Sequence, residues 1–590
     1  MFRNNYASGR VLTKEPKDLR LRLIFVFFVL LGTLTAVRLF YLMILQRDFY
    51  AALAGGSREV FSNLFPERGS IFIQDSRTGE EFPAAMNRDY FVVFVDTREI
   101  KNDADAENVT QKLAEIFGYD EEKKLAVFLP INKRDDPYEP IENKVDEEMV
   151  DKLKEFNLPG LGFVRKTFRF YPEGKLASQV IGFLGKDQTG NDVGRYGIEG
   201  YWQKELAGSG GFMTGARSPA GGLIPLAGWS FSAAEDGVDL LLTIDRSLQY
   251  KACEKLAQAK EEYGAVSAAL IIMDPKTGAI RAMCSVPEFD PNQYGSADSA
   301  DGYNNSTIFT QYEPGSVFKP ITMAAALNDG VITAESGFND TGSRSGLCSK
   351  PIKNASEKIY NYQSMSEILE NSVNTGAVYL AEKLGKKKFV EYVENFGFGI
   401  KSGIELDSEV SGNIDTLFEN KPEKVDCYTA TASFGQGITA TPLQLISAFS
   451  AIANGGKLLK PYIIDEIRHA DGSVDKIKPK EIRQVIDSRA AMLVSGMLVN
   501  VIDKGHAKQA GVKGYYVGGK TGTAQISGPG GYSAETNHTF VGFAPIVDPK
   551  FAMIVKFEKP QRTWADGTAA PVFGDVADFI LDYYQVPPER

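Results

Sequence analysis

Histidine and cysteine are scarce in this chain, which has 590 residues but only three histidines and four cysteines. The cysteines lie far apart, no two of them have the C-x-x-C spacing, and none lies near a group of histidines. This arrangement argues against a zinc site and against thioredoxin-like redox chemistry. The cysteines could pair as disulfides in an oxidising compartment, and their spacing leaves that question open. They are Cys253, Cys284, Cys348 and Cys427.

An excess of positive charge is also absent. The formal net charge is −11, which argues against nucleic acid as the main partner, because binding phosphates requires concentrated lysine and arginine. The histidines are scattered at His469, His506 and His538, so a Ser-His-Asp triad is a poor first hypothesis, although it is not excluded. With 43% hydrophobic and 24% charged residues, the composition is that of a globular protein, and the length predicts two or three folded units.

Only one stretch is hydrophobic enough to cross a membrane. Residues 23–45 carry a single charge, Arg38, and are predicted to form one transmembrane helix. Six lysines and arginines but only two acidic residues precede this stretch, which predicts a cytoplasmic tail at residues 1–22 and an exported remainder. The alternative is a signal peptide cleaved at residues 52–54, but polar residues 46–48 separate that site from the apolar run.

A glycine-rich stretch, residues 207–228, divides the remainder and is predicted to be an irregular connection. Before it, residues 57–230 mix strand-like runs with charged helical stretches and form a first predicted domain. Residues 101–151 are especially charged and are predicted to be solvated helices and loops. Residues 236–590 form the second predicted domain, with denser strand and helix patterns.

The second domain carries two hairpin patterns. In residues 267–286 and again in residues 540–557, two apolar runs flank a short turn that contains proline. Helical patterns lie between the hairpins, at residues 366–382 and 442–454. Strands at both ends with helices inserted between them predict an α+β fold, in which helices pack on one antiparallel sheet.

Ser316 and Lys319 form the first of three motifs that could carry chemistry. At the start of a helix, residues three apart share a face, so the lysine can reach the serine. A helix N-terminus favours a developing alkoxide and lowers the pKa of a nearby amine, so a neutral lysine can activate a serine nucleophile without a histidine. Pro320 lacks an N–H, which predicts a less regular turn. The spacing alone is weak, because Ser473 and Lys476 share it in a polar turn.

Ser372 and Asn374 form the second motif. If the backbone makes a loop or tight turn there, the hydroxyl and the carboxamide face one site. The hydroxyl can then relay a proton, and the amide can hold a substrate carbonyl or the lysine. The commoner explanation of such a pair is helix capping, as for the similar residues 411–413.

The third motif is Lys520 with Thr521, Gly522 and Thr523. The lysine supplies a positive charge for a carboxylate, and the two threonine hydroxyls can orient that carboxylate. A glycine on a strand lets another backbone, such as a peptide substrate, approach closely. Residues 276–278 repeat the K-T-G sequence but are explained by a hairpin turn.

The order of the three motifs is more specific than any one of them. S-x-x-K, S-x-N and K-T-G in this order are typical of penicillin-binding proteins and β-lactamases, and the chain resembles a class B penicillin-binding protein over nearly its whole length. The short pedestal and the chain end soon after residue 571 favour the cell-division subgroup. Stretches that resemble the non-catalytic pedestal, where they suit a hydrogen-bonded structural junction, are residues 68–71, 169–172 and 194–199; those that resemble the transpeptidase domain are residues 243–245, 434–437 and 570–573.

The resemblance implies a fold and a mechanism. The fold would be the penicillin-binding/serine β-lactamase-like transpeptidase fold, preceded by a dimerisation-type pedestal and the membrane helix. Ser316 would attack the carbonyl of a D-Ala-D-Ala stem peptide, Lys319 would accept its proton, and the N–H groups of Ser316 and Thr523 would form the oxyanion hole. Ser372 would pass a proton to the departing D-alanine. Asn374 would hold the substrate amide, and Lys520 and Thr521 would bind the terminal carboxylate.

The resemblance also implies partners and a location. β-Lactam antibiotics would bind as substrate mimics, no metal or organic cofactor would be needed, and the protein would act in septal peptidoglycan synthesis with a multispanning membrane glycan polymerase. It would sit in the bacterial cytoplasmic membrane as a single-pass protein with its catalytic domain outside. The N-terminal half has no E-D-x-x-F glycosyltransferase motif, so the chain is not expected to polymerise glycan itself.

Several alternatives stay open. The protein could be an elongation-type transpeptidase, a D,D-carboxypeptidase or a β-lactamase-like hydrolase, although the anchor and the pedestal argue against hydrolases. It could be a non-enzymatic β-lactam sensor, but a sensor would need further membrane spans and a cytoplasmic effector domain. A scaffold with accidental motifs is disfavoured by the complete ordered set.

Overall fold

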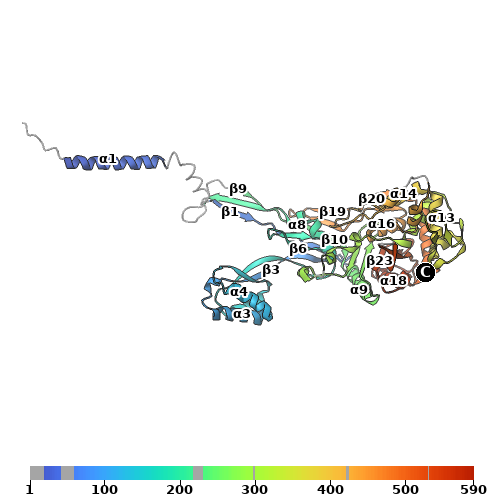
Figure 1. Cartoon of the computed structure of the whole chain (residues 1–590), viewed down its shortest axis with the longest axis horizontal. Helices are drawn as coiled ribbons and strands as arrows, with labels where there is room; N and C mark the ends of the chain where they lie inside the picture. Colours follow the sequence, from blue (N-terminus) through green and yellow to red (C-terminus); the bar gives the residue numbers. More distant parts are fainter. Residues whose placement is uncertain (1–18, 42–58, 217–229, 297–298, 420–423, 529–530) are drawn as a thin grey trace, which may run out of the picture. The chain divides into compact units, whose positions relative to one another are not determined.

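The computed structural model describes residues 19–41, 59–216, 230–296, 299–419, 424–528 and 531–590 (Figure 1). The chain falls into two compact units, one made of Met1–Pro66 with Ser209–Glu235 and the other of Glu67–Gly208 with Asp236–Arg590. All of the predicted site residues lie in the second unit.

The first unit contains the apolar helix α1 (Leu19–Phe40). Its stretch Leu23–Phe40 is long and apolar enough to cross a membrane, and none of it is buried against the protein. The hydroxyl groups of Thr33 and Thr35 donate to carbonyl oxygens one turn earlier, at 2.8 Å. These hydroxyls therefore present no unpaired donor to an apolar environment. The predicted helix continued to residue 45, and residues 42–45 lie outside the described residues.

A three-stranded antiparallel sheet also belongs to the first unit, in the order β1 (Glu59–Leu64), β8 (Gly211–Ala216) and β9 (Ser230–Ser232). The prediction of an irregular connection over residues 207–228 is wrong for β8. This strand pairs residue by residue with β1, which lies far away in the sequence, and such tertiary pairing overrides the local glycine signal. Residues 217–228 lie outside the described residues.

The second unit has a seven-stranded sheet to which both predicted domains contribute. β10 (Asp239–Asp245) lies between β18 (Ile464–Arg468), which is antiparallel to it, and β2 (Ile71–Gln74), which is parallel to it. β2 of the first predicted domain and β10 of the second therefore belong to one hydrogen-bonded sheet. The limits predicted for the two domains, at residues 230 and 236, remain predictions. The other strands of this sheet are β3 (Glu81–Val95), β4 (Glu139–Val145), β5 (Leu161–Phe170) and β19 (Val474–Lys476).

The charged residues 101–151 form helices around a small core of their own. Val109 and Leu113 of one helix and Val150 of another are fully buried with Val93 of β3. The prediction of solvated helices is confirmed for the three helices of this stretch, and their apolar stripes supply the buried face. The prediction of helices and loops is wrong for β4, which pairs with β3 as a strand. The helices are α3 (Asp103–Phe117), α4 (Glu121–Ile131) and α5 (Glu147–Glu155).

Glu199 joins all three of the pedestal stretches. It is fully buried, and it accepts hydrogen bonds from Arg68 Nε at 2.9 Å and from Arg169 Nε at 2.7 Å. Burial alone would raise the pKa of this carboxyl, but the two guanidinium groups hold it below its ordinary value. The expected hydrogen-bonded structural junction is confirmed.

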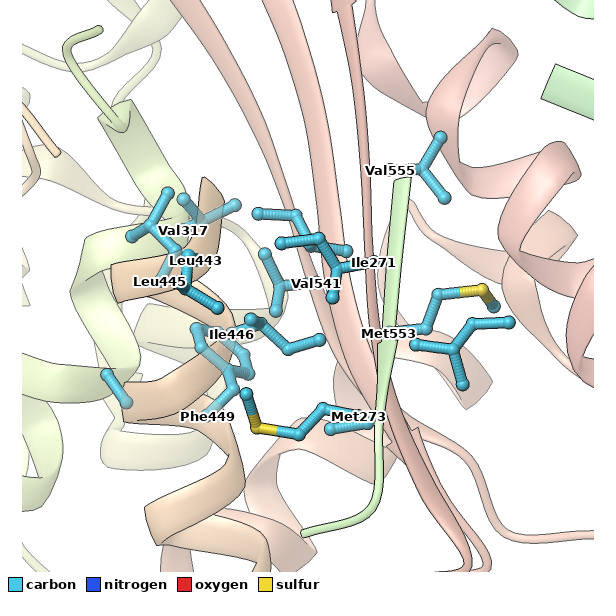
Figure 2. Packing of buried hydrophobic residues seen from close by; sticks show 14 of the residues in the cluster. Ile271, Met273, Val317, Leu443, Leu445, Ile446, Phe449, Val541, Met553 and Val555 are labelled. Atoms are coloured by element: carbon cyan, nitrogen blue, oxygen red, sulfur yellow. The ribbon is translucent and has the colours of Figure 1, made fainter. Parts of the chain in front are cut away.

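A five-stranded antiparallel sheet, in the order β12-β11-β23-β22-β21, confirms both predicted hairpins and the α+β class. Helix α16 covers one face, and Figure 2 shows Ile446 and Phe449 of this helix packed toward Ile271 of the sheet. Helix α18 covers the opposite face, where Phe573 packs on Phe540 with ring centroids 4.6 Å apart. The elements named here are β11 (Ser267–Met273), β12 (Ile280–Val286), β21 (Gly518–Gly528), β22 (Gly531–Ala544), β23 (Phe551–Glu558), α16 (Pro442–Ala453) and α18 (Ala569–Tyr583).

The cysteines form two disulfides, Cys253–Cys284 and Cys348–Cys427. The pairing that spacing left open is therefore settled in the structure. The first disulfide ties α9 (Arg246–Glu262) to β12 of the five-stranded sheet, and the second ties the segment before β15 (Ile352–Lys353) to the start of α15 (Cys427–Ala432). The elements around the site are η5 (Gly315–Phe318), α11 (Lys319–Asn328), α12 (Met365–Glu370), α13 (Asn374–Leu384), α17 (Ser488–Asp503) and η9 (Ala565–Gly567).

Further helices and strands complete these layers. They are α6 (Ser178–Ile181), β6 (Phe183–Lys186), β7 (Asp192–Arg195), α7 (Gly197–Tyr201), α8 (Gln203–Ala207), α9 (Arg246–Glu262), α10 (Ser306–Phe309), β13 (Gly337–Asp340), β14 (Ser343–Arg344), β15 (Ile352–Lys353), β16 (Asn361–Ser364), α14 (Lys386–Asn395), α15 (Cys427–Ala432), β17 (Lys457–Leu459) and β20 (Glu481–Gln484).

Candidate active site

Ser316 lies in a tight turn directly before a buried helix. It belongs to η5, a 3₁₀ turn, and α11 follows without a break. The Lys319 N–H donates to the Ser316 carbonyl, which is the hydrogen bond between residues three apart that defines a 3₁₀ turn. The α-helical bond to the same carbonyl would need an N–H on Pro320, and proline has none. The predicted irregular turn is thus confirmed. Val317 is fully buried against α16 (Figure 2), whereas Ser316 stays partly exposed.

Lys319 lies behind this turn, and its amine contacts the second motif. The fully buried side chain donates from Nζ to the Ser372 carbonyl at 2.5 Å and to Asn374 Oδ1 at 2.8 Å, and Nζ is 3.1 Å from Ser372 Oγ. Burial lowers the pKa of Lys319 well below its ordinary value, and the charge of Lys520 lowers it further. A neutral amine has a lone pair, so Lys319 can accept a proton.

The Lys319 amine is hydrogen-bonded to the second motif and not to the Ser316 hydroxyl in the described residues. Within the described residues, no hydrogen bond joins Lys319 Nζ to Ser316 Oγ; the bonds of Nζ go to Ser372 and Asn374. General-base hydrogen bonds of this kind often tighten only when substrate is bound.

The second motif interrupts the helix predicted over residues 366–382. That prediction is wrong at residues 371–373, which separate α12 from α13. Ser372 has φ of 55°, a left-handed conformation that costs about 1–2 kcal/mol in a residue with a Cβ atom. The turn brings the Ser372 carbonyl to Lys319 Nζ, so the backbone strain lies at the candidate site.

The third motif lies on β21, which is the edge strand of the five-stranded sheet. β22 pairs with one side of β21, and no strand of the described chain pairs with the other side. Such an edge can pair with an extended peptide through main-chain hydrogen bonds. Lys520 is buried with its Nζ 3.1 Å from the Thr521 carbonyl, and burial lowers its pKa to about 7.

Gly522 lets β21 approach the nucleophile turn. A Cβ atom at this position would lie 2.9 Å from the Pro314 carbonyl oxygen and 3.0 Å from a methyl of Val317. The turn that carries Ser316 therefore fills the space beside Gly522. The sequence predicted that a substrate backbone would approach at this glycine. This glycine positions Ser316 against the strand that carries Lys520.

The three motifs open on one cavity of about 370 Å³. This volume suits the end of a short peptide. Lys319, Lys520 and Gly522 are buried and do not line the cavity themselves. The predicted site residues that line the cavity are Ser316, Ser372, Asn374, Thr521 and Thr523.

Other walls of the cavity come from segments that carry no motif. The sequence held no local signal for them, because they meet only in the folded chain. They include Lys358, Tyr360, His506, Trp564 and Asp566.

The lookalike residues and the other histidines lie in structural settings. Val474–Lys476, within the second S-x-x-K, forms the exposed strand β19, and Gly278 of the second K-T-G turns a hairpin with φ of 84°. His538 is buried and bonds Thr536 and Thr568. Within the described ranges, no group of three or more histidine, cysteine, aspartate or glutamate residues is placed to hold a metal ion.

Comparison with known families decides what this arrangement belongs to. The penicillin-binding protein transpeptidase domain matches residues 268–578, and the penicillin-binding protein dimerisation domain matches residues 64–240. The chain belongs to the class B penicillin-binding proteins.

Relatives of this penicillin-binding protein extend over most of its length. Stage V sporulation protein D of Bacillus subtilis is 33% identical over 97% of this chain and 87% of its own. The peptidoglycan D,D-transpeptidase FtsI of Escherichia coli is 30% identical over 76% of this chain and 72% of its own.

Solved structures share the fold of this penicillin-binding protein. Penicillin-binding protein 3 of Mycobacterium tuberculosis, in complex with aztreonam, matches with a TM-score of 0.67 at 24% identity over 90% of this chain and 98% of its own. Penicillin-binding protein 2X of Streptococcus thermophilus matches with a TM-score of 0.71 at 21% identity over 89% of this chain and 80% of its own.

Proposed function

We propose that the protein is a serine D,D-transpeptidase that cross-links peptidoglycan stem peptides through an acyl-enzyme on Ser316. The observation that carries this proposal is the convergence of three separate motifs on one cavity, with a buried low-pKa lysine bound to Ser372 and Asn374 directly behind the Ser316 turn. Relatives named peptidoglycan D,D-transpeptidase support the same activity.

In the first half-reaction, Ser316 Oγ attacks the carbonyl of the penultimate D-alanine while Lys319 Nζ takes the hydroxyl proton. The oxygen of the tetrahedral intermediate accepts hydrogen bonds from the N–H groups of Ser316 and Thr523. The C–N bond then breaks, and Ser372, 3.1 Å from Lys319 Nζ, passes the proton to the departing D-alanine. Ser316 is left as an ester of the donor peptide.

The second half-reaction runs in reverse with another nucleophile. An amine of a neighbouring stem peptide attacks the ester carbonyl and forms the new amide, and Ser316 regains its proton. Asn374 holds the donor amide, and Lys520 with Thr521 holds the terminal carboxylate of the donor. A β-lactam enters the first half-reaction only: its ring amide opens, the leaving nitrogen stays tethered, and the acyl-enzyme persists.

Three features support the proposed location. α1 anchors the chain in the cytoplasmic membrane, and the positive residues before it keep the N-terminus in the cytoplasm. Two disulfides fit a catalytic domain in an oxidising, extracytoplasmic compartment. There the protein works in septal cell-wall synthesis beside a multispanning membrane glycan polymerase that supplies the glycan strands.

A transfer assay tests the proposal. The detergent-solubilised full-length protein is incubated with a peptide ending in D-Ala-D-Ala, with and without an amine acceptor, and products are followed by mass spectrometry. We expect release of D-alanine together with an acceptor-dependent amide product, and loss of both after penicillin treatment. Release of D-alanine with hydrolysed donor only, at every acceptor concentration, would make the protein a D,D-carboxypeptidase instead.

The second-order rate constant for acylation is expected to have a maximum in its pH profile. Lys319 acts as a base when neutral, so the rate rises as pH increases through its lowered pKa. Lys520 holds a carboxylate only when protonated, and its pKa is about 7, so the rate falls as pH increases through that value. In Lys520→Arg, which keeps its charge, the alkaline fall should disappear. A wild-type rate that stays level between pH 7 and pH 9 would contradict the role given to Lys520.

A further inference from the structure

Two basic side chains, Lys358 and His506, line the cavity but have no part in the acyl-transfer scheme. One acidic side chain, Asp566, also lines the cavity, so the basic lining groups outnumber the acidic one in a chain whose net charge is −11. The question is which part of a substrate they would meet.

Lys358 is held in place without a carboxylate partner. Its Nζ lies 4.6 Å from the centroid of the Tyr360 ring, and its carbonyl accepts a hydrogen bond from Asn354 Nδ2 at 3.0 Å. No ion pair to Lys358 is found among the described residues. Lys353, on the same segment, differs: it pairs with Glu357 at 2.8 Å and does not line the cavity.

His506 is presented to the cavity by the turn that follows α17. A Cβ atom on the preceding Gly505 would lie 2.5 Å from the Val501 carbonyl oxygen and 2.8 Å from the Glu370 carbonyl oxygen. The turn is therefore packed tightly against the end of α12, where Asn371 and the Ser372 turn begin. The imidazole is exposed and makes no hydrogen bond within the part of the chain that the structure covers.

We propose that Lys358 and His506 form a subsite for a carboxylate on the peptide arm of the donor substrate. This carboxylate is separate from the terminal one, which is assigned to Lys520 and Thr521. The proposal rests on the proposed acylation of Ser316 and adds a preference for donors with acidic arms over donors whose arm is neutral or amidated.

The chemistry of the subsite favours a carboxylate. An ammonium and an imidazole both donate hydrogen bonds, and a carboxylate has two oxygens that accept them. With a neutral amide arm these two donors would stay hydrogen-bonded to water, so the amide arm would gain less binding free energy from Lys358 and His506. The adjacent Asn371 offers a further polar group at the cavity surface.

A matched pair of β-lactams tests the subsite. Benzylpenicillin and α-carboxybenzylpenicillin differ by one carboxylate on the side chain, which occupies the place of the peptide arm. The second-order acylation rate constants of both compounds are measured on the full-length protein, and their ratio, carboxylated over parent, is compared between variants. We expect Lys358→Met to lower this ratio about twofold to fivefold, which is typical of losing a partly exposed ion pair.

His506→Gln should lower the ratio in the same direction, and added salt should lower the wild-type ratio because exposed ion pairs are screened. Lys353→Met, on the same segment but outside the cavity, should leave the ratio at the wild-type value. The rate with benzylpenicillin reports whether each variant is folded. A ratio that is unchanged in both Lys358→Met and His506→Gln overturns the subsite alone. Failure of the wild-type protein to react with either compound overturns the proposed acylation and the subsite with it.

Discussion

Ser316→Ala is expected to abolish covalent labelling by a fluorescent penicillin while leaving the protein folded. Removing the hydroxyl from a partly exposed side chain creates no core cavity, because the buried Val317 and Lys319 hold the turn. The loss of rate should exceed about 10³-fold, as expected when a serine nucleophile is removed. Gel fluorescence measures the labelling, and mass spectrometry of the wild-type adduct locates the modified peptide.

Ser473→Ala is the matched control, because Ser473 has the same spacing to a lysine but lies in an exposed turn. Labelling of this variant should equal that of the wild type. An adduct on Ser372 in place of Ser316, or persistent labelling of Ser316→Ala, would show that the nucleophile has been assigned to the wrong hydroxyl.

Lys319→Arg is expected to slow acylation by about 10²- to 10⁴-fold, the usual contribution of a general base. Arginine can still donate hydrogen bonds to the Ser372 carbonyl and to Asn374, but it carries a positive charge that the low-pKa lysine can give up. It cannot lose a proton at any accessible pH, however, so it cannot receive the one from Ser316. Stopped-flow measurement of penicillin acylation gives the rate.

Lys520→Arg is the control for inserting a larger cation into a buried site of the same cavity. It keeps a charged partner for the substrate carboxylate, so its loss of rate at neutral pH should be far smaller than that of Lys319→Arg. Both variants need a native far-ultraviolet circular dichroism spectrum. Equal rates for Lys319→Arg and the wild type would mean that another group takes the proton.

Much of the fold was predictable because its signals are local. The two hairpins join apolar runs through turns that contain proline, and α16 begins at Pro442 with Thr441 as its cap, so their types follow from nearby residues. The strand β8 was not predictable in this way. Its glycines favour a loop, and only the pairing with β1, far away in sequence, makes it a strand.

The site shows the same division between local and distant causes. Ser316, Lys319 and Lys520 could be predicted because their spacing has a chemical meaning. The left-handed Ser372 could not, since a continuous helical pattern surrounds it and its conformation goes with a contact to Lys319. Lys358 and His506 could not either, because neither belongs to a motif and the two residues line one cavity only in the folded chain.

The parallel pairing of β2 with β10 has a practical consequence. Cutting the chain just before residue 236 would remove β2 and leave the buried strand β10 with a row of unpaired N–H and C=O groups. Such a bare edge promotes aggregation. A shortened protein for crystallisation or inhibitor screening should therefore begin upstream of Arg68, so that it retains the Arg68–Glu199 contact and so that β10 of the seven-stranded sheet is produced together with the strand that pairs with its edge.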